Sequence, residues 1–387
     1  MLPNHSISIG VDASNIRQGG GITHLSNILN NLEPELCNIS KVYIWSNQKT
    51  LNKISDKPWL EKRNHFLLDG NLLQRTYWQI FFLKSQLKYE ACDLLFIPGG
   101  YYVFNFSPAV TMNQNLLPFE WREIARNKFS FRTLKFVFLR VLQKSSFKRS
   151  EGVIFLSRNA RDVVKETFND FNVKTQIIPH GIDEIFFQAP RKQLSIDHYS
   201  KEKPFRFIYV STIDHYKHQW NVVAAVSNLI DLGYPIRLDL YGSSNKNALS
   251  LLEKAIAKYD KNKKFIKYHD EIDHSKIKQI YLSADASIFS SSCETFGQII
   301  LESMASGLPI ACSNMSAMPE ILEGAGVYFN PLDIYDIQRA LENLLNSSKE
   351  RQLMAEQAFK LAQNYSWEKA SLSTFQFLEF IYQDNKL

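Results

Sequence analysis

The residues best suited to chemistry lie in one short segment, where seven residues separate Glu294 from Glu302. Thr295 and Gln298 form a Thr-x-x-Gln pattern before an apolar run, which predicts a helix capped by Thr295. The free N–H groups and the dipole at such a helix start favour an anion such as a diphosphate. Gly297 in the first turn lets a bulky ligand approach the backbone. One carboxylate can then face the reacting end of the ligand while the other reaches its hydroxyl groups, because carboxylates accept strong hydrogen bonds.

Both this segment and a glycine run near the start of the chain also have purely structural interpretations. The glutamate pair alone fits an ordinary capped helix with two exposed side chains. Gly19, Gly20 and Gly21 follow the first predicted strand and open a predicted helix over Ile22–Leu32. They do not fit the Gly-x-Gly-x-x-Gly pattern of dinucleotide sites, so a phosphate contact and a flexible turn both remain open.

Short β-branched runs alternate with longer amphipathic segments, which predicts parallel sheets covered by helices. The helix predicted over Asn221–Asp231 ends before Gly233 and Pro235, as helices commonly do. The irregular, polar stretch 181–204 separates two series of strands. The predicted fold class is therefore α/β with two doubly wound domains, whose ligand lies at the carboxyl ends of the strands. The predicted strands are Ile7–Asp12, Lys41–Ser46, Leu94–Pro98, Ala109–Gln114, Gly152–Ser157 and Thr175–Pro179, then Arg206–Ser211, Arg237–Tyr241, Phe265–Tyr268, Ala286–Ser290, Pro309–Ser313 and Val327–Phe329.

Length and composition agree with a globular chain in a reducing compartment. With 387 residues, 45% of them hydrophobic, the chain can bury two substantial cores. The four cysteines are scattered without Cys-x-x-Cys spacing, so we expect reduced thiols rather than disulfides or a zinc site. We find no signal-peptide pattern and no apolar run of about 18 residues, and therefore expect a cytoplasmic protein. The net charge of +6 favours anionic partners without choosing among them.

A basic and apolar segment covers residues 128–149. It carries seven Lys or Arg residues, no acidic residue and ten large apolar side chains. A helix with an apolar side and a cationic side would suit an anionic membrane surface, here the inner face of the plasma membrane. The alternative is a core-packing helix with a solvated basic face. The membrane interpretation predicts that charge reversal at Arg132, Lys135 and Arg140 releases the protein from anionic liposomes.

The full segment Ile288–Ser313 resembles the donor-site signature of the family four glycosyltransferases. In that family a pair of glutamates separated by seven residues sits in a Ser-x-x-Glu-x-Phe-Gly and Glu-Ala-Met-Ala-x-Gly-x-Pro setting, and Ser303 stands here in place of the first alanine. Further matches in the expected order are Pro179–Asp183, Met318–Ile321, Gly326, Pro331–Asp333 and Tyr365–Trp367.

The resemblance implies a GT-B fold, in which two Rossmann-like domains face each other across a cleft. Residues 1–182 would form the acceptor-side domain and residues 183–365 the nucleotide-sugar donor domain. A helix over residues 366–387 would cross back to the first domain.

The resemblance also implies roles for single residues. As catalytic residues, Glu294 would bind the donor sugar and Lys217 the leaving diphosphate, where a cation stabilises developing negative charge. For Lys217 the alternative is a surface lysine at a helix start. Glu302 would bind the ribose. The other residues assigned to donor binding are Thr212 and the backbone of Phe296, Gly297, Gln298 and Ile299.

Two positions depart from the family pattern. Thr212 stands where the family usually has an arginine, so diphosphate neutralisation would depend on Lys217, the helix start or another residue such as Arg17. Asn113 stands where the family often has a histidine. The residues assigned to an acceptor or phosphate loop are Gly20, Gly21 and Asn113, and those assigned to the interdomain segment are His180 and Gly181.

The implied activity is transfer, with retention of configuration, of a sugar from a UDP- or GDP-sugar to a glycan or lipid-linked saccharide of lipopolysaccharide, O-antigen or capsule. We see no carboxylate nucleophile and expect a front-face attack, with the departing phosphate helping to accept the acceptor proton. The sequence contains no Asp-x-Asp pair, and its histidines lack convincing ligand spacing, so no metal or other cofactor is expected. The alternatives are an epimerase or phosphorylase of the same fold, or a non-catalytic sugar-nucleotide-binding protein. Nucleic-acid binding is not expected, because no reading motif accompanies the basic residues.

Overall fold

The computed structural model describes residues 6–17, 19–126, 131–262 and 264–386, apart from the side chains of Phe131, His274 and Ser275. The chain divides into two compact units. Unit 1 comprises Met1–Gly181 and Ser366–Leu387, and unit 2 comprises Ile182–Tyr365. The boundary expected from the sequence lies one residue later, between residues 182 and 183.

Unit 1 is built on a seven-stranded parallel sheet in the order β3-β2-β1-β4-β5-β6-β7. The winding reverses between β1 and β4, which places a topological switch point at their carboxyl ends. Ile9 and Val11 of β1 are fully buried, as expected for a central strand covered on both faces. The strands are β1 (Ile7–Asp12), β2 (Ile39–Trp45), β3 (Leu60–Arg63), β4 (Leu94–Ile97), β5 (Ala109–Asn113), β6 (Gly152–Phe155) and β7 (Lys174–Ile177).

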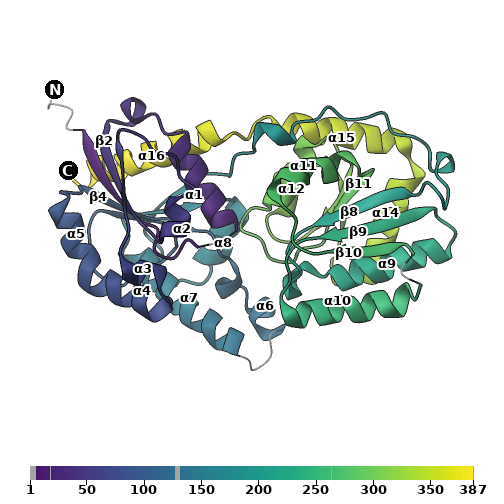
Figure 1. Cartoon of the computed structure of the whole chain (residues 1–387), viewed down its shortest axis with the longest axis horizontal. Coiled ribbons are helices and arrows are strands. Elements are labelled where there is room, and N and C mark those ends of the chain that lie inside the picture. Colours follow the sequence, from purple (N-terminus) through teal and green to yellow (C-terminus); the bar gives the residue numbers. More distant parts are fainter. Residues whose placement is uncertain (1–5, 18, 127–130, 263, 387) are drawn as a thin grey trace. The chain divides into compact units, whose positions relative to one another are not determined.

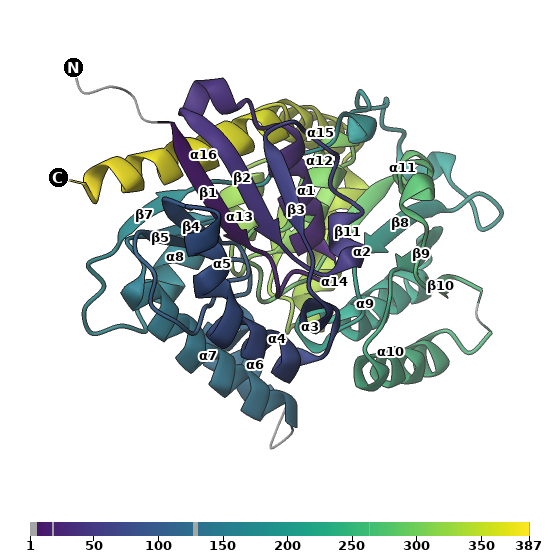
Figure 2. The same cartoon turned by 60° about the vertical axis from the view of Figure 1, so that its left-hand side comes forward.

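Helices cover both faces of this sheet. The C-terminal helix α16 lies beside α1, whereas α4 and α7 lie on the other side (Figures 1 and 2). A π-helical turn over Gln79–Leu83 joins α4 to α5. The helices of unit 1 are α1 (Gly20–Asn30), α2 (Gln48–Leu51), α3 (Phe66–Asp69), α4 (Leu72–Trp78), α5 (Lys84–Tyr89), α6 (Trp121–Arg126), α7 (Phe131–Arg149), α8 (Arg158–Lys165) and α16 (Trp367–Asp384), with short 3-10 turns η1 (Pro34–Cys37) and η3 (Leu117–Phe119).

Unit 2 contains a six-stranded parallel sheet in the order β10-β9-β8-β11-β12-β13. Its switch point lies between β8 and β11, the strands that precede Lys217 and Glu294. The strands are β8 (Phe205–Val210), β9 (Ile236–Tyr241), β10 (Ile266–His269), β11 (Ala286–Phe289), β12 (Ile310–Ser313) and β13 (Val327–Phe329). The helices are α9 (Gln219–Asp231), α10 (Lys246–Tyr259), α11 (His274–Leu282), α12 (Gln298–Ala305), α13 (Met318–Leu322), α14 (Ile334–Asn346) and α15 (Ser348–Ala362), with 3-10 turns η4 (Glu184–Phe186), η5 (Ile196–His198) and η6 (His215–Lys217).

The predicted fold class is confirmed, because both units are parallel α/β sheets wound in two directions from a central strand. Within unit 2, all six predicted strands are present. In unit 1 the edge strand β3 was not predicted.

Candidate active site

The turn before α12 differs from the sequence-based prediction. The N-cap of α12 is Gly297, which has a φ of 104° and makes no side-chain capping bond. The predicted capping box of Thr295 and Gln298 is therefore wrong, because the helix starts only at Gln298. Gly297 can adopt a backbone conformation that other residues rarely reach, and a Cβ there would lie 2.9 Å from Cε of Met318. The chain therefore enters α12 through a turn that favours glycine.

The two predicted catalytic residues are neighbours. Lys217 Nζ donates to Glu294 Oε1 as an ion pair between the loop after β8 and the loop after β11. The Lys217 ammonium also lies 4.6 Å from the ring centroid of Phe289 and 4.9 Å from that of Tyr216. Ser316 fixes the backbone of Glu294, accepting from its N–H and donating to its carbonyl, both at 2.8 Å.

Lys217 is a buried residue rather than a solvated surface lysine, because only 6% of it is exposed. It ends the 3-10 turn η6, and its carbonyl accepts hydrogen bonds from Tyr209 Oη at 2.6 Å and Ser290 Oγ at 2.9 Å. The next residue, His218, has a φ of 50° and lies 2.9 Å from Ser292 Oγ through Nε2. These bonds fasten the lysine loop to the end of β11, so the position of Nζ is set by both strands at the switch point.

Glu302 is also buried, which excludes the interpretation of an exposed helix residue. It is 8% exposed, and Tyr281 Oη donates to its Oε2 at 2.9 Å. Burial raises the pKa of Glu302 to about 7, and the nearby Asp183 adds to this effect, whereas the Tyr281 hydrogen bond opposes it. A carboxyl group with this pKa exchanges its proton near neutral pH.

Ser303, which departs from the family pattern, has a local structural role. Its hydroxyl donates to Ser287 Oγ of β11 at 2.8 Å and contacts the Ile299 carbonyl at 3.0 Å. The side chain is buried, so the extra hydroxyl is satisfied within the core between α12 and β11.

The remaining donor-binding candidates differ in exposure. Phe296 is buried and packs its ring against Tyr365, with a centroid distance of 5.7 Å, so only its backbone is suited to ligand contact. Gln298 and Ile299 are partly exposed. Thr212 is exposed, and its carbonyl accepts from Gln219 Nε2 at 3.0 Å.

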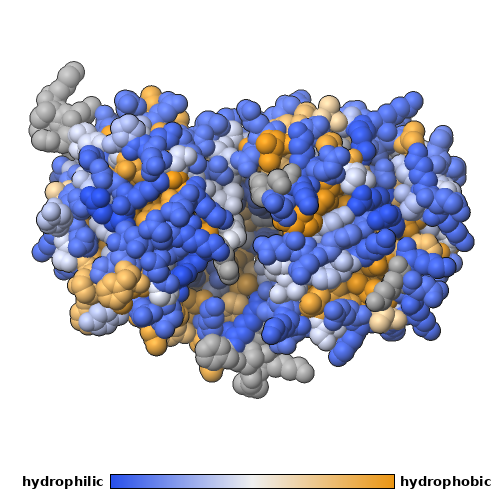
Figure 3. Space-filling model, in the orientation of Figure 1, coloured by the Kyte–Doolittle hydropathy of each residue, from blue (hydrophilic) through white to orange (hydrophobic). Residues whose placement is uncertain are grey.

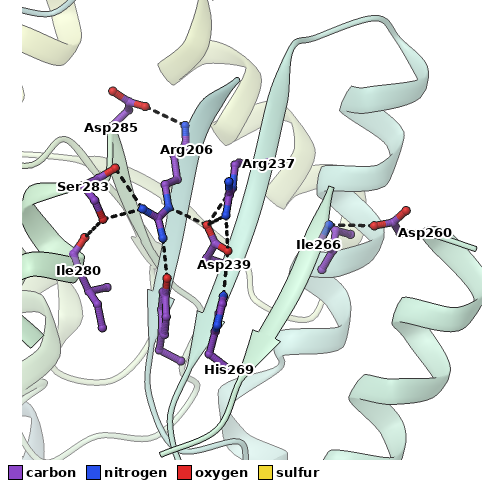
Figure 4. A network of polar contacts seen from close by, with 10 residues as sticks. Arg206, Arg237, Asp239, Asp260, Ile266, His269, Ile280, Ser283 and Asp285 are labelled. Carbon is purple, nitrogen blue, oxygen red and sulfur yellow. Dashed lines mark hydrogen bonds and ion pairs between the residues drawn. The ribbon is translucent and has the colours of Figure 1, made fainter. Parts of the chain in front are cut away.

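A polar network joins side chains of β8, β9 and β10 (Figure 4). The buried Asp239 accepts hydrogen bonds from Arg206 Nε at 2.6 Å and Arg237 NH2 at 2.8 Å, and lies 3.0 Å from His269 Nε2. Burial alone would raise the pKa of Asp239, but the bonds from Arg237, His269 and Arg206 lower it. The ring of His269 stacks on Tyr241 at 4.4 Å. The network therefore joins side chains of three adjacent strands, β8, β9 and β10.

Known proteins resemble this chain both in sequence and in structure. Residues 191–361, all within unit 2, match the family model described as glycosyl transferases group 1. Among solved structures, the chain resembles sucrose-phosphate synthase from Thermosynechococcus elongatus, with a TM-score of 0.78 and 16% identity over 98% of this chain and 100% of that one. It also resembles WaaG, a glycosyltransferase involved in lipopolysaccharide biosynthesis, with a TM-score of 0.70 and 14% identity over 96% and 99% of the two chains. The fold is GT-B.

Curated relatives align with only part of the GT-B chain. O-antigen chain mannosyltransferase B of Escherichia coli is 25% identical over 60% of this chain and 58% of its own length. O-antigen chain mannosyltransferase RfbU of Salmonella typhimurium is 26% identical over 54% of this chain and 55% of its own length. The alignment thus spans little more than half of each relative.

Within the first GT-B unit, Gly20 begins α1, and a Cβ on Gly21 would lie 3.3 Å from Gln114 Oε1. Asn113 ends β5 and is fully buried; its Nδ2 donates to the Asn115 carbonyl at 3.2 Å. Arg17 donates to the carbonyls of Leu68, Asp69 and Gly70 at the end of α3. That guanidinium therefore caps a short helix within unit 1.

The two interdomain candidates lie next to the start of α16 in unit 1, and His180 also contacts α1. His180 Nδ1 lies 2.9 Å from His24 Nδ1, and both rings pack edge-on or tilted against Trp367. Burial lowers the pKa of His180 to about 3 and that of His24 well below its usual value, which keeps both imidazoles neutral. A Cβ on Gly181 would lie 2.2 Å from the backbone nitrogen of Trp367, so the start of α16 requires glycine here.

The basic segment is a helix, α7, but its faces differ from the prediction. Residues 128–130 lie outside the described residues. Arg140 donates to the carbonyls of Pro118 and Phe119 and stacks on Trp121, so this cation is used within unit 1. The apolar residues that face outward at helical spacing are Leu134, Val137, Phe138 and Val141. The helix thus buries one stripe and exposes a second apolar stripe flanked by the exposed Lys135 and Lys148.

Among the described residues, no group of three or more His, Cys, Asp or Glu side chains is arranged to hold a metal ion. In the same part of the chain, no helix combines the length and the apolar character needed to cross a bilayer.

Proposed function

We propose that this chain is a glycosyltransferase that takes a sugar from a nucleotide-sugar donor bound to unit 2. The observation that carries the proposal is the ion pair between the buried Lys217 and the partly buried Glu294, which precedes α12, with Glu302 about one turn along that helix. A diphosphate at this helix start would meet the positive end of the helix dipole and an ammonium, and the two carboxylates suit hydroxyl groups on either side of it.

The proposed mechanism uses the ion pair in two ways. Lys217 has three N–H donors, so it can keep its bond to Glu294 while donating to the phosphate oxygens. There it stabilises the negative charge that grows as the bond between sugar and phosphate breaks. Glu294 accepts from the donor sugar and holds it beside this charge. We propose transfer with retention, in which the leaving phosphate accepts the proton of the attacking hydroxyl, and no metal ion takes part.

The proposed donor is a UDP- or GDP-sugar, and the proposed acceptor is a glycan or lipid-linked saccharide of a bacterial surface polysaccharide. The names of the O-antigen mannosyltransferase relatives and of WaaG support this class of acceptor. A solved structure of the same fold in complex with UDP and glucose, from Anabaena, supports a nucleotide-sugar donor.

Calorimetry with UDP-, GDP-, ADP- and dTDP-sugars in the presence of a chelator tests the donor site. The wild-type protein should bind one donor selectively, and Glu302→Gln should lower the affinity for that donor by about tenfold or more. Glu356→Gln, an exposed position on α15, is the matched control and should bind normally. Binding that appears only after magnesium or manganese is added would overturn the metal-free mechanism. No binding under any condition would overturn the transferase assignment.

We also propose that unit 1 docks on anionic membrane through the exposed stripe of α7 and the neighbouring α4–α5 segment. The latter exposes Leu73, Tyr77, Ile80 and Phe81, and apolar side chains gather over this region at the lower left of Figure 3. Residues 70–89 and 131–149 together contain nine Lys or Arg and no acidic residue, whereas the rest of the chain has 36 basic and 39 acidic residues. The positive charge of the protein is therefore concentrated beside its exposed apolar faces, as binding to anionic lipid requires.

Cosedimentation with phosphatidylglycerol vesicles tests this partner. Combined Phe81→Ser and Phe138→Ser substitutions, or Lys135→Glu with Lys148→Glu, should reduce the bound fraction severalfold. Tyr335→Ser, at an exposed aromatic residue of unit 2, should not. Equal binding of all these variants, or binding to neutral vesicles as strong as to anionic ones, would contradict the proposal.

A further inference from the structure

The residue that contacts Glu302 was not singled out by any sequence motif. Tyr281 lies near the end of α11, is 1% exposed and donates to Glu302 Oε2 at 2.9 Å. Of the described residues, only Tyr281 hydrogen-bonds the Glu302 carboxyl group. Because the carboxyl is buried, this bond supplies most of the polar stabilisation that its charged form receives from the protein.

The phenol is held firmly in the donating state. Its ring packs edge-on against Phe186 of η4, with a centroid distance of 5.9 Å. Burial raises the pKa of Tyr281 well above its usual value, and the neighbouring Glu302 adds to this effect, so the hydroxyl stays protonated. Tyr281 can therefore donate to Glu302 at neutral and mildly alkaline pH.

Two groups near Glu302 affect the ionisation of its carboxyl group in opposite directions. Asp183, just before η4, disfavours a second negative charge, whereas the Tyr281 hydroxyl favours it. A ribose with two hydroxyl donors binds best to a carboxylate, because each oxygen of the charged form accepts strongly. A protonated carboxyl group would be a weaker acceptor for the ribose hydroxyl groups, and its own O–H would compete with them as a donor.

We propose that Tyr281 is a positioning residue that keeps Glu302 charged and oriented towards the ribose, so that donor affinity depends on the bond from the Tyr281 hydroxyl to this carboxyl group. This inference rests on the proposed function for the role of Glu302, and extends it to a pH dependence set by a residue that need not touch the donor.

The experiment compares Tyr281→Phe with wild type in calorimetric titrations with the selected nucleotide sugar at about pH 7 and about pH 9, at and above the pKa of Glu302. The variant keeps the ring and loses only the hydroxyl. We expect about tenfold weaker binding than wild type at the lower pH and a difference of less than about threefold at the higher pH, because alkali restores the carboxylate. The ratio of the dissociation constants of variant and wild type at each pH is unaffected by the ionisation of the ligand itself.

Two controls separate the possible outcomes. Tyr234→Phe removes a tyrosine hydroxyl that donates to Glu342 at 3.0 Å elsewhere in unit 2, and should leave the ratio near one at both pH values. A loss in Tyr281→Phe that is equal at both pH values, or no loss, would overturn the inference.

A donor-free measurement decides the point even if no nucleotide sugar binds. Carbon-13 NMR titration of the Glu302 carboxyl should show a higher pKa in Tyr281→Phe than in wild type. An unchanged pKa would overturn the inference, whereas absence of donor binding by wild type would count only against the proposed function.

Discussion

At the scale of single residues, burial gives the Lys217–Glu294 pair its importance. Lys217 is 6% exposed and its ammonium lies beside two aromatic rings, whereas the Glu294 side chain is 17% exposed. Removing one member of such a pair leaves the other desolvated and uncompensated. In the proposed donor complex this ammonium would lie close to the diphosphate, and its low exposure would strengthen its effect on a developing charge.

Replacing Lys217 by Met should therefore abolish most of the catalysis while leaving donor binding measurable. We expect a fall of about 100-fold or more in release of nucleoside diphosphate from the selected donor, because the leaving group loses its cation. Lys217→Arg should not restore the rate, since a planar guanidinium does not fit a site built around a point charge. The exposed Lys254→Met is the control. Normal turnover by Lys217→Met would show that the pair is only structural.

The buried carboxyl of Glu302 predicts a pH-dependent stability. Its pKa is raised from 4.5 to about 7, so the unfolded chain releases this proton at a lower pH than the folded chain. The protonated Glu302 therefore contributes to the free energy of unfolding below pH 4.5, and this contribution is lost as the pH rises through about 7. The whole contribution is about 3 kcal/mol. Glu302→Gln should avoid that loss. Urea unfolding measures the free energy of unfolding at about pH 4.5 and about pH 8.5. The stability of Glu302→Gln relative to wild type should be greater at the higher pH. An equal difference at both pH values would contradict this prediction.

At the scale of secondary-structure elements, one glycine determines how the helix of the donor site begins. Gly297 turns the chain between Glu294 and α12 in a left-handed conformation and is the N-cap residue of that helix. Only glycine adopts this backbone geometry easily, and the absence of a side chain at this position lets a bulky group approach the backbone closely.

Gly297→Ala should destabilise unit 2 by about 1–3 kcal/mol, because alanine is strained at this φ. Gly324→Ala is the matched control in the same unit, since a Cβ there meets nothing within 4 Å and its φ is not in the left-handed region. It should change stability by less than about 0.5 kcal/mol or increase it slightly. Urea denaturation of the two variants measures the difference. Equal effects would mean that the turn relaxes around a side chain.

The same elements show how far sequence alone leads. Buried strands were predicted closely because runs such as Ile7–Asp12 and Ala286–Phe289 are apolar and bounded by turn residues. Strand β3 was missed because Leu60–Arg63 is a short edge strand whose last three residues are charged. Spacing placed Glu294 and Glu302 at one helix, but burial decides their chemistry, and burial depends on residues far away in sequence. Tyr281 gave no signal, because a single tyrosine in an amphipathic helix resembles any core residue.

At the scale of the whole chain, unit 1 is completed by a helix that follows unit 2 in sequence. Ser371 Oγ of α16 donates to the Ile28 carbonyl of α1 at 2.6 Å, and Phe375, Leu378 and Ile381 are buried. A Cβ on Gly152 of β6 would lie 3.0 Å from the ring of Phe377, which shows how closely this helix covers the sheet.

Phe375→Ala should cost about 3–5 kcal/mol in the unfolding of unit 1, because the fully buried ring leaves a cavity. Phe380→Ala, on the same helix but 49% exposed, should cost less than about 1 kcal/mol. Hydrogen exchange of the amides of β6 and α1 reports unit 1 directly and should accelerate only in the first variant. Unaffected exchange in both would show that α16 contributes little to the stability of that unit.

The closing of unit 1 by α16 has a consequence for synthesis. Domains usually fold in the order in which they leave the ribosome. Here unit 2 is one continuous stretch, Ile182–Tyr365, and all of it emerges before α16 does. The faces of α1 and β6 that α16 covers therefore remain bare while unit 2 folds. Unit 2 can therefore complete its fold first on the nascent chain, and unit 1 is completed only when α16 has emerged.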